Sequence, residues 1–263
     1  MSRDKVIYLV VGVVLGLIVG VVIANGINSG ELEKMRGELT RLRAGAPKGA
    51  AEAGGGPQVA TAEGESAALP QLTEGELRNA VAKADASPQD AALQRTAGQG
   101  LYLYAMQTGN SALLPDVARI LKRAHEAAPD DYPIAVLAGN AHFLVARGGG
   151  DTGTLREARK FYERALSAKP DDIVVRTSLG LTYFFDRPPD AARAVREYRK
   201  ALEIDPRHEM PLQSLVAALV ESGDFAEAEK RLRELEGVNP SNPELPNLRA
   251  QLEQKRNASK ERD

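Results

Sequence analysis

Along the second half of the chain, apolar and small residues recur at the i, i+4, i+7 spacing that places them on one face of a helix. In one such segment these positions are Ala194, Tyr198 and Ala201, and Pro206 follows where the helix has to end. Segments of this kind end at a series of prolines about 34 to 41 residues apart: Pro88, Pro129, Pro170, Pro206 and Pro240. This period indicates one helical unit that is repeated and stacked several times.

A second apolar segment precedes each of these helices, and its small residues, such as Gly139 and Gly180, let two helices approach closely. The pattern therefore predicts helix pairs, whose members we call the first and the second helix of each repeat. The expected order is a single helix over 73–87, helix pairs over about 89–127, 131–168, 172–204 and 208–238, and a last helix over 242–260. The predicted fold class is all-α.

Polar residues at the helix starts support these boundaries. Thr73 and Glu76 have the spacing of a capping box. Aspartates follow two of the prolines, where they would cap the next helix and interact favourably with its dipole: Asp130, Asp131, Asp171 and Asp172. The last helix has leucines on one side, at Leu245, Leu248 and Leu252. We expect this helix to cover the apolar end of the stack.

These repeats resemble the tetratricopeptide repeat (TPR) family. The resemblance rests on the clearest unit, at Leu179, Gly180, Tyr183, Ala194, Tyr198, Ala201 and Pro206. It covers about residues 73–258 and implies a TPR-type α-solenoid of helical hairpins. Two repeats run to about 41 residues instead of the family's 34, with the extra length in turns between paired helices. Because the chain has no tryptophan, smaller residues such as Leu212 replace the family's first-helix aromatic.

The resemblance further implies that the first helices line a concave groove, which holds an extended peptide or a partner helix. Aligning the repeats on Gly98, Gly139, Gly180 and Val216 places ten side chains in this groove: Arg95, Gln99, Tyr102, Val136, Asn140, Phe143, Thr177, Leu181, Phe184 and Gln213. Arg95, Gln99 and Asn140 are expected to hydrogen-bond a peptide backbone or a terminal carboxylate. The aromatic rings are expected to form apolar pockets. Packing of those rings between helices is the alternative.

The N-terminal residues follow a different pattern. After a head of residues 1–5, residues 6–24 are 19 uncharged, mostly apolar positions, about 28 Å long as a helix at ~1.5 Å per residue. This stretch predicts a transmembrane helix. A cleavable signal peptide is the alternative, although its apolar region usually has about 7–15 residues. Arg3 and Lys5 favour a cytoplasmic N-terminus, whereas the basic residues after the span are mixed with acidic ones. We expect a single-pass protein of a bacterial inner membrane with periplasmic repeats.

Two features near the N-terminus favour a parallel homodimer. Small residues recur every four positions in the span, a spacing that lets two membrane helices pack closely: Gly12, Gly16 and Gly20. Residues 30–43 have the a/d spacing of a short coiled coil, with its seam at Leu32, Met35, Leu39 and Leu42. An amphipathic helix lying on lipid or on the repeats is the alternative. Residues 44–72 are rich in Gly, Ala and Pro and predict a flexible linker.

Composition excludes several functional classes. The chain has no cysteine, which excludes disulfides and thiolate sites. Its net charge of −2 gives no electrostatic argument for nucleic acid as a partner. The three histidines, His125, His142 and His208, lie far apart in the sequence. The glycine run at 148–150 lacks the Lys-Ser/Thr of a phosphate loop. We therefore expect no enzymatic activity, no cofactor and no metal site.

The predicted anchor, linker and groove indicate a membrane-anchored scaffold that binds partner proteins or peptides for assembly of an envelope complex. A narrower hypothesis comes from the last three repeats, which look similar to those of anchored TPR proteins in bacterial cytochrome c maturation. Such proteins hold apocytochrome tails. A third hypothesis is a purely structural dimeric tether. Binding of a c-type cytochrome tail would favour the second hypothesis, and a groove that binds no peptide would favour the third.

Overall fold

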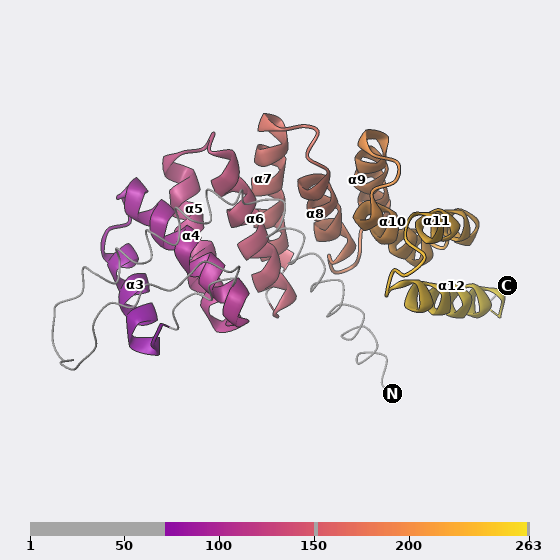
Figure 1. Ribbon diagram of the computed structural model, residues 1–263, viewed down its shortest axis with the longest axis horizontal. Helices are drawn as coiled ribbons and strands as arrows, with labels where there is room; N and C mark the ends of the chain where they lie inside the picture. Colours follow the sequence, from indigo (N-terminus) through magenta and orange to yellow (C-terminus); the bar gives the residue numbers. More distant parts are fainter. Residues whose placement is uncertain (1–71, 150–151, 262–263) are drawn as a thin grey trace, which may run out of the picture.

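The computed structural model describes residues 72–149 and 152–261 (Figure 1). Within these ranges the regular secondary structure is helical, with one short 3-10 turn at Ser111–Leu113. The α-helices are α3 (Glu74–Ala86), α4 (Ala91–Thr108), α5 (Leu114–Ala127), α6 (Tyr132–Arg147), α7 (Thr152–Ala168), α8 (Ile173–Phe184), α9 (Ala191–Ile204), α10 (Glu209–Ser222), α11 (Phe225–Val238) and α12 (Leu245–Lys260). The order of one single helix, four pairs and a last helix is the one that the sequence pattern predicts.

Several predictions concern residues outside these ranges. The membrane span over 6–24, the coiled coil over 30–43 and all but the last residue of the linker over 44–72 lie there. The residues assigned to dimerisation, from Gly12 to Leu42, lie there too. Among the helices that the structure describes, none combines the length and the apolar character needed to cross a membrane. The anchor and the dimer therefore stay predictions.

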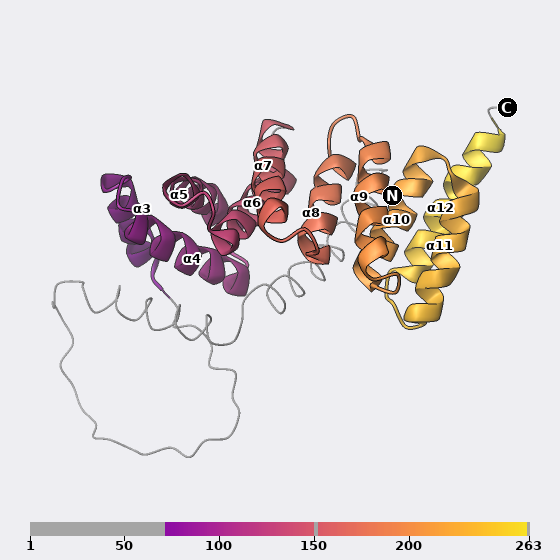
Figure 2. The ribbon, with the colours of Figure 1, turned by 90° about the horizontal axis from the view of Figure 1, so that it is seen from above.

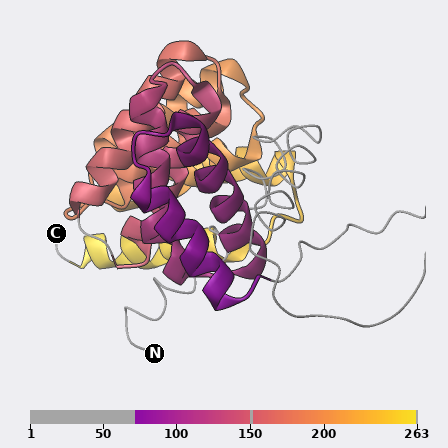
Figure 3. The same cartoon turned by 90° about the vertical axis from the view of Figure 1, so that its left-hand side faces the viewer.

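The helix pairs stack in chain order. In each pair α4, α6, α8 or α10 is the first helix and packs on the second helix that follows it, α5, α7, α9 or α11. The pairs run along the long axis of the molecule from α3 at one end to α12 at the other (Figures 1 and 2). Seen from the α3 end, the later pairs lie behind the first and are turned relative to it (Figure 3). This arrangement is the predicted α-solenoid.

The stack is tighter on its first-helix side. Successive first helices contact one another, α4 with α6, α6 with α8 and α8 with α10, whereas contacts between successive second helices of the pairs are sparser. The first helices therefore lie where the repeats come closest, on the inner side of the stack. Helix α12 contacts both α10 and α11 and takes the place that a next first helix would occupy. Its Leu245, Leu248 and Leu252 are buried, as expected of a covering helix.

Side-chain caps fix most of the helix starts. The predicted capping box is present, because Thr73 Oγ1 accepts from the Glu76 N–H at 3.2 Å and the Thr73 N–H donates to Glu76 Oε2 at 2.8 Å. Asp131 and Asp172 cap α6 and α8 through the N–H groups of the third residue beyond each. The aspartate before each of them is not the cap. Asp130 instead forms an ion pair with Arg164.

Close approach of the two helices in a pair depends on glycine. A Cβ atom on Gly98, Gly139 or Gly180 would lie less than 3.0 Å from a side chain of the paired second helix. In the first pair Gly98 meets Leu121, in the second Gly139 meets Tyr162, and in the third Gly180 meets Tyr198. Both tyrosines are at most 1% exposed. The missing glycine side chain is thus the space that the large side chain fills.

The two tyrosines differ in the hydrogen bonding of their hydroxyl groups. Tyr162 donates to Asn140 Oδ1 across the pair at 2.8 Å. The Tyr198 hydroxyl is buried and makes no hydrogen bond within the described residues. Burial raises the pKa of both phenols well above its usual range, so both stay protonated and neutral. The rings of Tyr162 and Tyr198 therefore fill equivalent spaces, but only the Tyr162 hydroxyl has a hydrogen-bond partner among the described residues.

The first prediction tests the glycine contacts. Replacing Gly180 with Ala should lower the free energy of unfolding, measured by urea denaturation, because the added methyl group overlaps the immobile ring of Tyr198. Overpacking of this kind costs about 1–3 kcal/mol, which should exceed the ~1 kcal/mol that alanine gains in helix propensity. Gly237 is the matched control, since nothing lies within 4 Å of its added Cβ. Gly237→Ala in α11 should raise stability; equal effects of the two variants would contradict the packing argument.

The second prediction compares the equivalent tyrosines. Tyr162→Phe should cost about 0.5–1.5 kcal/mol of unfolding free energy, because it removes the hydrogen bond to Asn140. Tyr198→Phe should leave stability unchanged or raise it, since it removes a buried hydroxyl without a partner among the described residues. Both values come from denaturant unfolding of the two variants beside the native chain. A larger loss for Tyr198→Phe than for Tyr162→Phe would refute this assignment.

Candidate functional site

The first helices carry the side chains predicted for the groove, and the structure divides these into buried and accessible ones. Six of the ten are at most 9% exposed: Tyr102, Asn140, Phe143, Thr177, Leu181 and Gln213. Gln99, Val136 and Phe184 are partly exposed, and Arg95 is exposed. The buried members therefore lie inside the stack and not on an open surface. The assignment of these residues to a binding groove stays a prediction.

Arg95 and Gln213 link consecutive repeats. They occupy equivalent positions of the first helices α4 and α10. Arg95 forms an ion pair with Asp131, the N-cap of the next first helix. Gln213 Oε1 accepts a hydrogen bond from Asn242 Nδ2 at 3.3 Å. Asn242 lies shortly before α12 and two residues after Pro240, as Asp131 lies two residues after Pro129. The two side chains thus hold the following unit in register, a role that the sequence alignment did not assign to them.

Asn140 belongs to a buried polar group between the repeats. Its Oδ1 accepts the hydrogen bond of Tyr162, while its Nδ2 has no partner within the described residues. Burial raises the pKa of Tyr102, and an interaction with Asn140 opposes that rise. Asn140 thus connects the first helix α4, through Tyr102, with the second helix α7. Thr177 is also internal, and its hydroxyl donates to the Ile173 carbonyl of its own helix at 2.7 Å.

An aromatic cluster stands at the ends of α6 and α8. Phe143 is 4% exposed and lies 6.0 Å, between ring centroids, from Phe185. Phe185 in turn packs edge-on against Phe184 at 5.2 Å. The guanidinium of Arg147 lies 3.7 Å from the centroid of the Phe185 ring. Phe143 is therefore the base of the cluster, and the partly exposed Phe184 and Phe185 form its outer layer.

Phe185 and Arg147 were missed by the sequence alignment, which assigned only Phe184 to the groove. The available signal was the Phe184-Phe185 doublet itself. In a helix two adjacent side chains point in directions about 100° apart, so the same neighbouring helix cannot bury both of them. Helix α8 ends at Phe184, and Phe185 is its C-cap. The end of the helix explains why the second ring folds back over Phe143.

The accessible part of the first-helix row is mostly apolar. We define the first-helix face by its partly exposed members on α4, α6, α8 and α10: Gln99, Val136, Phe184, Phe185, Met210 and Ala217. Helices α4, α6 and α8 contain one charged residue each, all of them arginine. The second helices are richer in charge and in ion pairs, such as Lys160 with Glu157. The first-helix face is therefore suited to contact apolar side chains of another chain.

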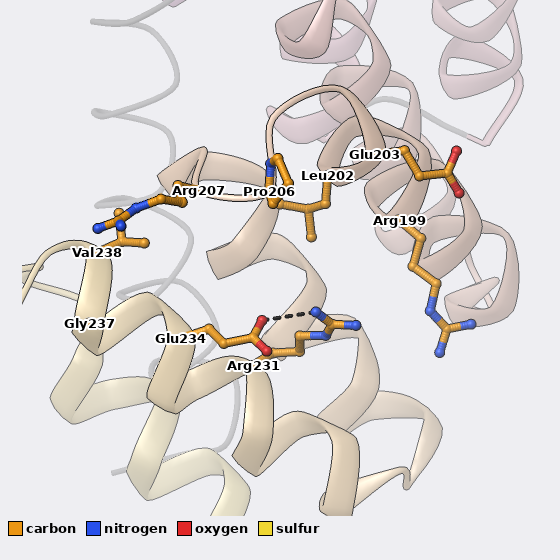
Figure 4. Close-up of a pocket in the computed structure, with 9 residues that line it drawn as sticks. All are labelled: Arg199, Leu202, Glu203, Pro206, Arg207, Arg231, Glu234, Gly237 and Val238. Atoms are coloured by element: carbon orange, nitrogen blue, oxygen red, sulfur yellow. Dashed lines mark hydrogen bonds and ion pairs between the residues drawn. The ribbon is translucent and has the colours of Figure 1, made fainter.

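A separate hollow of about 620 Å³ lies between the second helices α9 and α11 (Figure 4). Its walls combine apolar and charged side chains: Arg199, Leu202, Glu203, Pro206, Arg207, Arg231, Glu234, Gly237 and Val238. Arg231 and Glu234 are joined by an ion pair at 2.8 Å, drawn in Figure 4. Arg231 and Arg199 both also pair with Glu227. The hollow opens where successive second helices diverge, away from the predicted groove.

Groups suited to catalysis or metal binding do not gather in residues 72–149 and 152–261. No cluster of three or more His, Asp or Glu side chains able to hold a metal ion occurs there. Burial lowers the pKa of His125 and His142, so both rings are neutral at neutral pH. Neither has a nucleophile or a carboxylate as its hydrogen-bond partner: His142 Nδ1 donates to the Ala138 carbonyl at 2.8 Å. The expected absence of enzymatic activity remains an expectation.

Comparisons with known proteins support the repeat assignment. A family model described as tetratricopeptide repeat matches residues 190–252, which span α9, α10, α11 and the first half of α12. A comparison with curated proteins finds no match.

Solved structures with a similar fold include TPR proteins. A crystal structure of MamA is 20% identical in sequence, with a TM-score of 0.50, and the match covers 64% of this chain and 88% of that one. The crystal structure of YrrB, described as a TPR protein with an unusual peptide-binding site, is 14% identical, with a TM-score of 0.53, and the match covers 67% of this chain and 83% of that one. Similarity at this level of identity concerns the fold. The described helices thus form an α-solenoid of the tetratricopeptide-repeat type, and residues 190–252 match the repeat family's own model.

Proposed function

We propose that this protein is a membrane-anchored, non-enzymatic scaffold whose first-helix face binds a segment of a partner protein. The observation on which the proposal depends is the division of surfaces in the stack. The second helices are covered with charged residues that pair with one another, whereas the first-helix face is nearly free of charge and leaves aromatic and aliphatic side chains partly exposed. Such a face binds by burying apolar side chains.

The aromatic cluster is the strongest candidate for an anchor point on that face. Phe184 and Phe185 are partly exposed, yet both are held in place, Phe185 by Phe143 beneath it and by Arg147 at its face. Aromatic side chains that are already ordered lose little entropy on binding, and aromatic residues dominate binding energy at interfaces. YrrB, whose fold is similar, is described as having a peptide-binding site. In this chain we place the corresponding activity on the first-helix face.

The anchor and the location rest on the sequence. Residues 6–24 have the length and apolar character of a membrane span. Arg3 and Lys5 precede it and favour a cytoplasmic N-terminus. We propose that the solenoid stands outside the cytoplasm of a bacterial cell, joined to the span by the linker over 44–72, and that it gathers proteins of the envelope. Pairing through the glycines of the span and the seam from Leu32 to Leu42 would make the scaffold a homodimer.

The third prediction tests the binding face. Phe185→Ala should reduce recovery of the partner from detergent-solubilised membranes, since truncation of an interface anchor costs on the order of 1–3 kcal/mol, a loss of roughly 5- to 150-fold in affinity. Recovery is measured by quantitative mass spectrometry after affinity purification of the full chain. Lys160→Ala is the control, because this side chain is 68% exposed on the second helix α7. It should leave recovery unchanged.

The outcome also separates the binding scaffold from a structural tether. Unfolding curves of both variants must first be shown to match the native chain. If the Phe185→Ala variant is folded and recovers the same proteins in the same amounts, the face does not bind them and the tether is favoured. A c-type cytochrome among the proteins lost from the variant would identify the narrower cytochrome maturation role.

The fourth prediction tests the topology. A periplasmic alkaline phosphatase fused after Asp263 should be active, since the C-terminus would lie on the far side of the membrane from Arg3 and Lys5. A fluorescent protein that folds only in the cytoplasm should be dark at the same position. The reverse pattern would place the repeats in the cytoplasm. Recovery of the fusion without its first 24 residues would show that residues 6–24 are a cleaved signal.

A further inference from the structure

Two of the chain's three histidines pack against one phenylalanine at the middle of the solenoid. The ring of His125, on α5, meets Phe161 edge-on with 5.1 Å between centroids. The ring of His142, on α6, lies 5.0 Å from the same Phe161 and is tilted by 42°. Phe161 is on α7 and is 5% exposed. Side chains from three consecutive helices, belonging to two different repeats, therefore meet at this one ring.

This contact lies at the junction between two hydrophobic cores. The buried apolar side chains of α3, α4 and α5 form one core, and those from α7 to α12 form a second. Helix α6 contributes to both, with Leu137 in the first and Phe143 in the second. Among the described buried residues of α7, Phe161 alone belongs to the first core, while its neighbour Tyr162 belongs to the second. The two histidines thus contact the one described buried side chain of α7 that packs in the N-terminal core.

Each of the two imidazole rings has a nitrogen that can take up a second proton. The Nδ1–H of His142 donates to the Ala138 carbonyl, which leaves Nε2 as the atom that takes the second proton. His125 Nδ1 is buried and has no hydrogen-bond partner in the described part of the chain. A charged imidazole gains some attraction from the ring of Phe161 but loses its hydration. Loss of hydration is the larger effect at these sites, because burial is the leading cause of the lowered pKa of both histidines.

The charged groups around the histidines come from α5, from α7 and from the turn between α5 and α6. Near His142 lie Lys122 of α5 and Glu157 of α7, which pair with each other at 3.4 Å. Near His125 lie Arg164 of α7, Glu126 of α5 and the aspartates of the α5–α6 turn, Asp130 and Asp131. Arg164 pairs with Asp130, and Asp131 pairs with Arg95. Since Glu157, Asp130 and Asp131 already have cationic partners, a protonated histidine would have to compete for these three carboxylates.

We propose that His125 and His142 form a proton-sensitive hinge, in which charging the two rings loosens their contact with Phe161 and lets the N-terminal and C-terminal halves of the solenoid move relative to each other. Folding lowers the pKa of these histidines, so the unfolded or opened junction binds protons more readily than the closed one. Stability of the junction is therefore complete above the unfolded pKa of about 6.5 and is lost as the pH falls through and below it. The first-helix row runs through this junction, so its curvature would change with pH.

The fifth prediction tests the hinge by a distance between the two halves. The chain has no cysteine, so Gln107→Cys on α4 and Gln254→Cys on α12 place two spin labels without competing sites. The distribution of distances between the two labels is measured by pulsed electron paramagnetic resonance on the full-length chain in detergent. The measurements are made at about pH 7.5 and about pH 5, on either side of the ordinary histidine pKa. In the native background we expect the distribution to shift and broaden at the lower pH. In the His125→Gln/His142→Gln background it should be the same at both values.

Two controls keep this test specific. His208→Gln removes the third histidine, which lies before α10 and away from the junction, and should preserve the full pH response. Labels at Ala192→Cys on α9 and Gln254→Cys on α12 are both attached to exposed positions on helices of the C-terminal half and should show no pH response. The hinge is overturned if the native chain gives the same distribution at both pH values. It is equally overturned if the response persists in the double variant or if the control label pair moves as much as the pair that spans the junction.

Discussion

The approach of a large side chain to a bare helix backbone is the contact on which this solenoid depends. Gly98, Gly139 and Gly180 each leave room for a side chain of the paired second helix, and two of these side chains are tyrosines that are at most 1% exposed. This contact sets the distance between the helices of a pair. In the fourth pair the sizes are exchanged, with Val216 on the first helix and Leu232 at the second-helix position that Tyr198 has in the third.

The stacking of pairs then determines which surfaces are left for a partner. Polar side chains of the first helices are largely used within the protein: Arg95 and Gln213 reach the next repeat, and Asn140 is enclosed between Tyr102 and Tyr162. What remains accessible on the inner side is mostly apolar, whereas the outer side presents paired charges and the hollow between α9 and α11. Helix α12 buries its leucines at the C-terminal end of the stack, and Ile204 is the one exposed large apolar side chain in the described residues.

The sequence predicts the fold well because the signals for it are local. Helical periodicity, the prolines between repeats and the caps at Thr73, Asp131 and Asp172 depend on neighbours within one or two turns. The alignment on glycine also places the first helices correctly in the stack. Even the replaced aromatic position follows, since Leu212 is fully buried in α10.

The candidate site is less predictable because exposure depends on contacts between repeats. Phe143 and Phe184 are equivalent in the alignment, but α6 continues for another turn beyond Phe143 while α8 ends at Phe184. Phe185, at the end of α8, covers Phe143 and leaves Phe184 in the outer layer. Arg95 likewise has the composition of a ligand-binding residue, but Asp131 of the following repeat engages it. Neither the different exposure of the two phenylalanines nor the ion pair of Arg95 can be read from the sequence of one repeat alone.

Photo-crosslinking in living cells tests most directly whether the first-helix face is where this protein meets its partner. A photoreactive phenylalanine analogue is placed in turn at Gln99, Val136 and Phe184 on the first helices, and at the exposed second-helix positions Lys122, Lys160 and Lys200. Our account predicts that irradiation joins the chain to the same partner from the first three positions and to none from the last three. Adducts formed equally from both sets, or from the second helices alone, would contradict it.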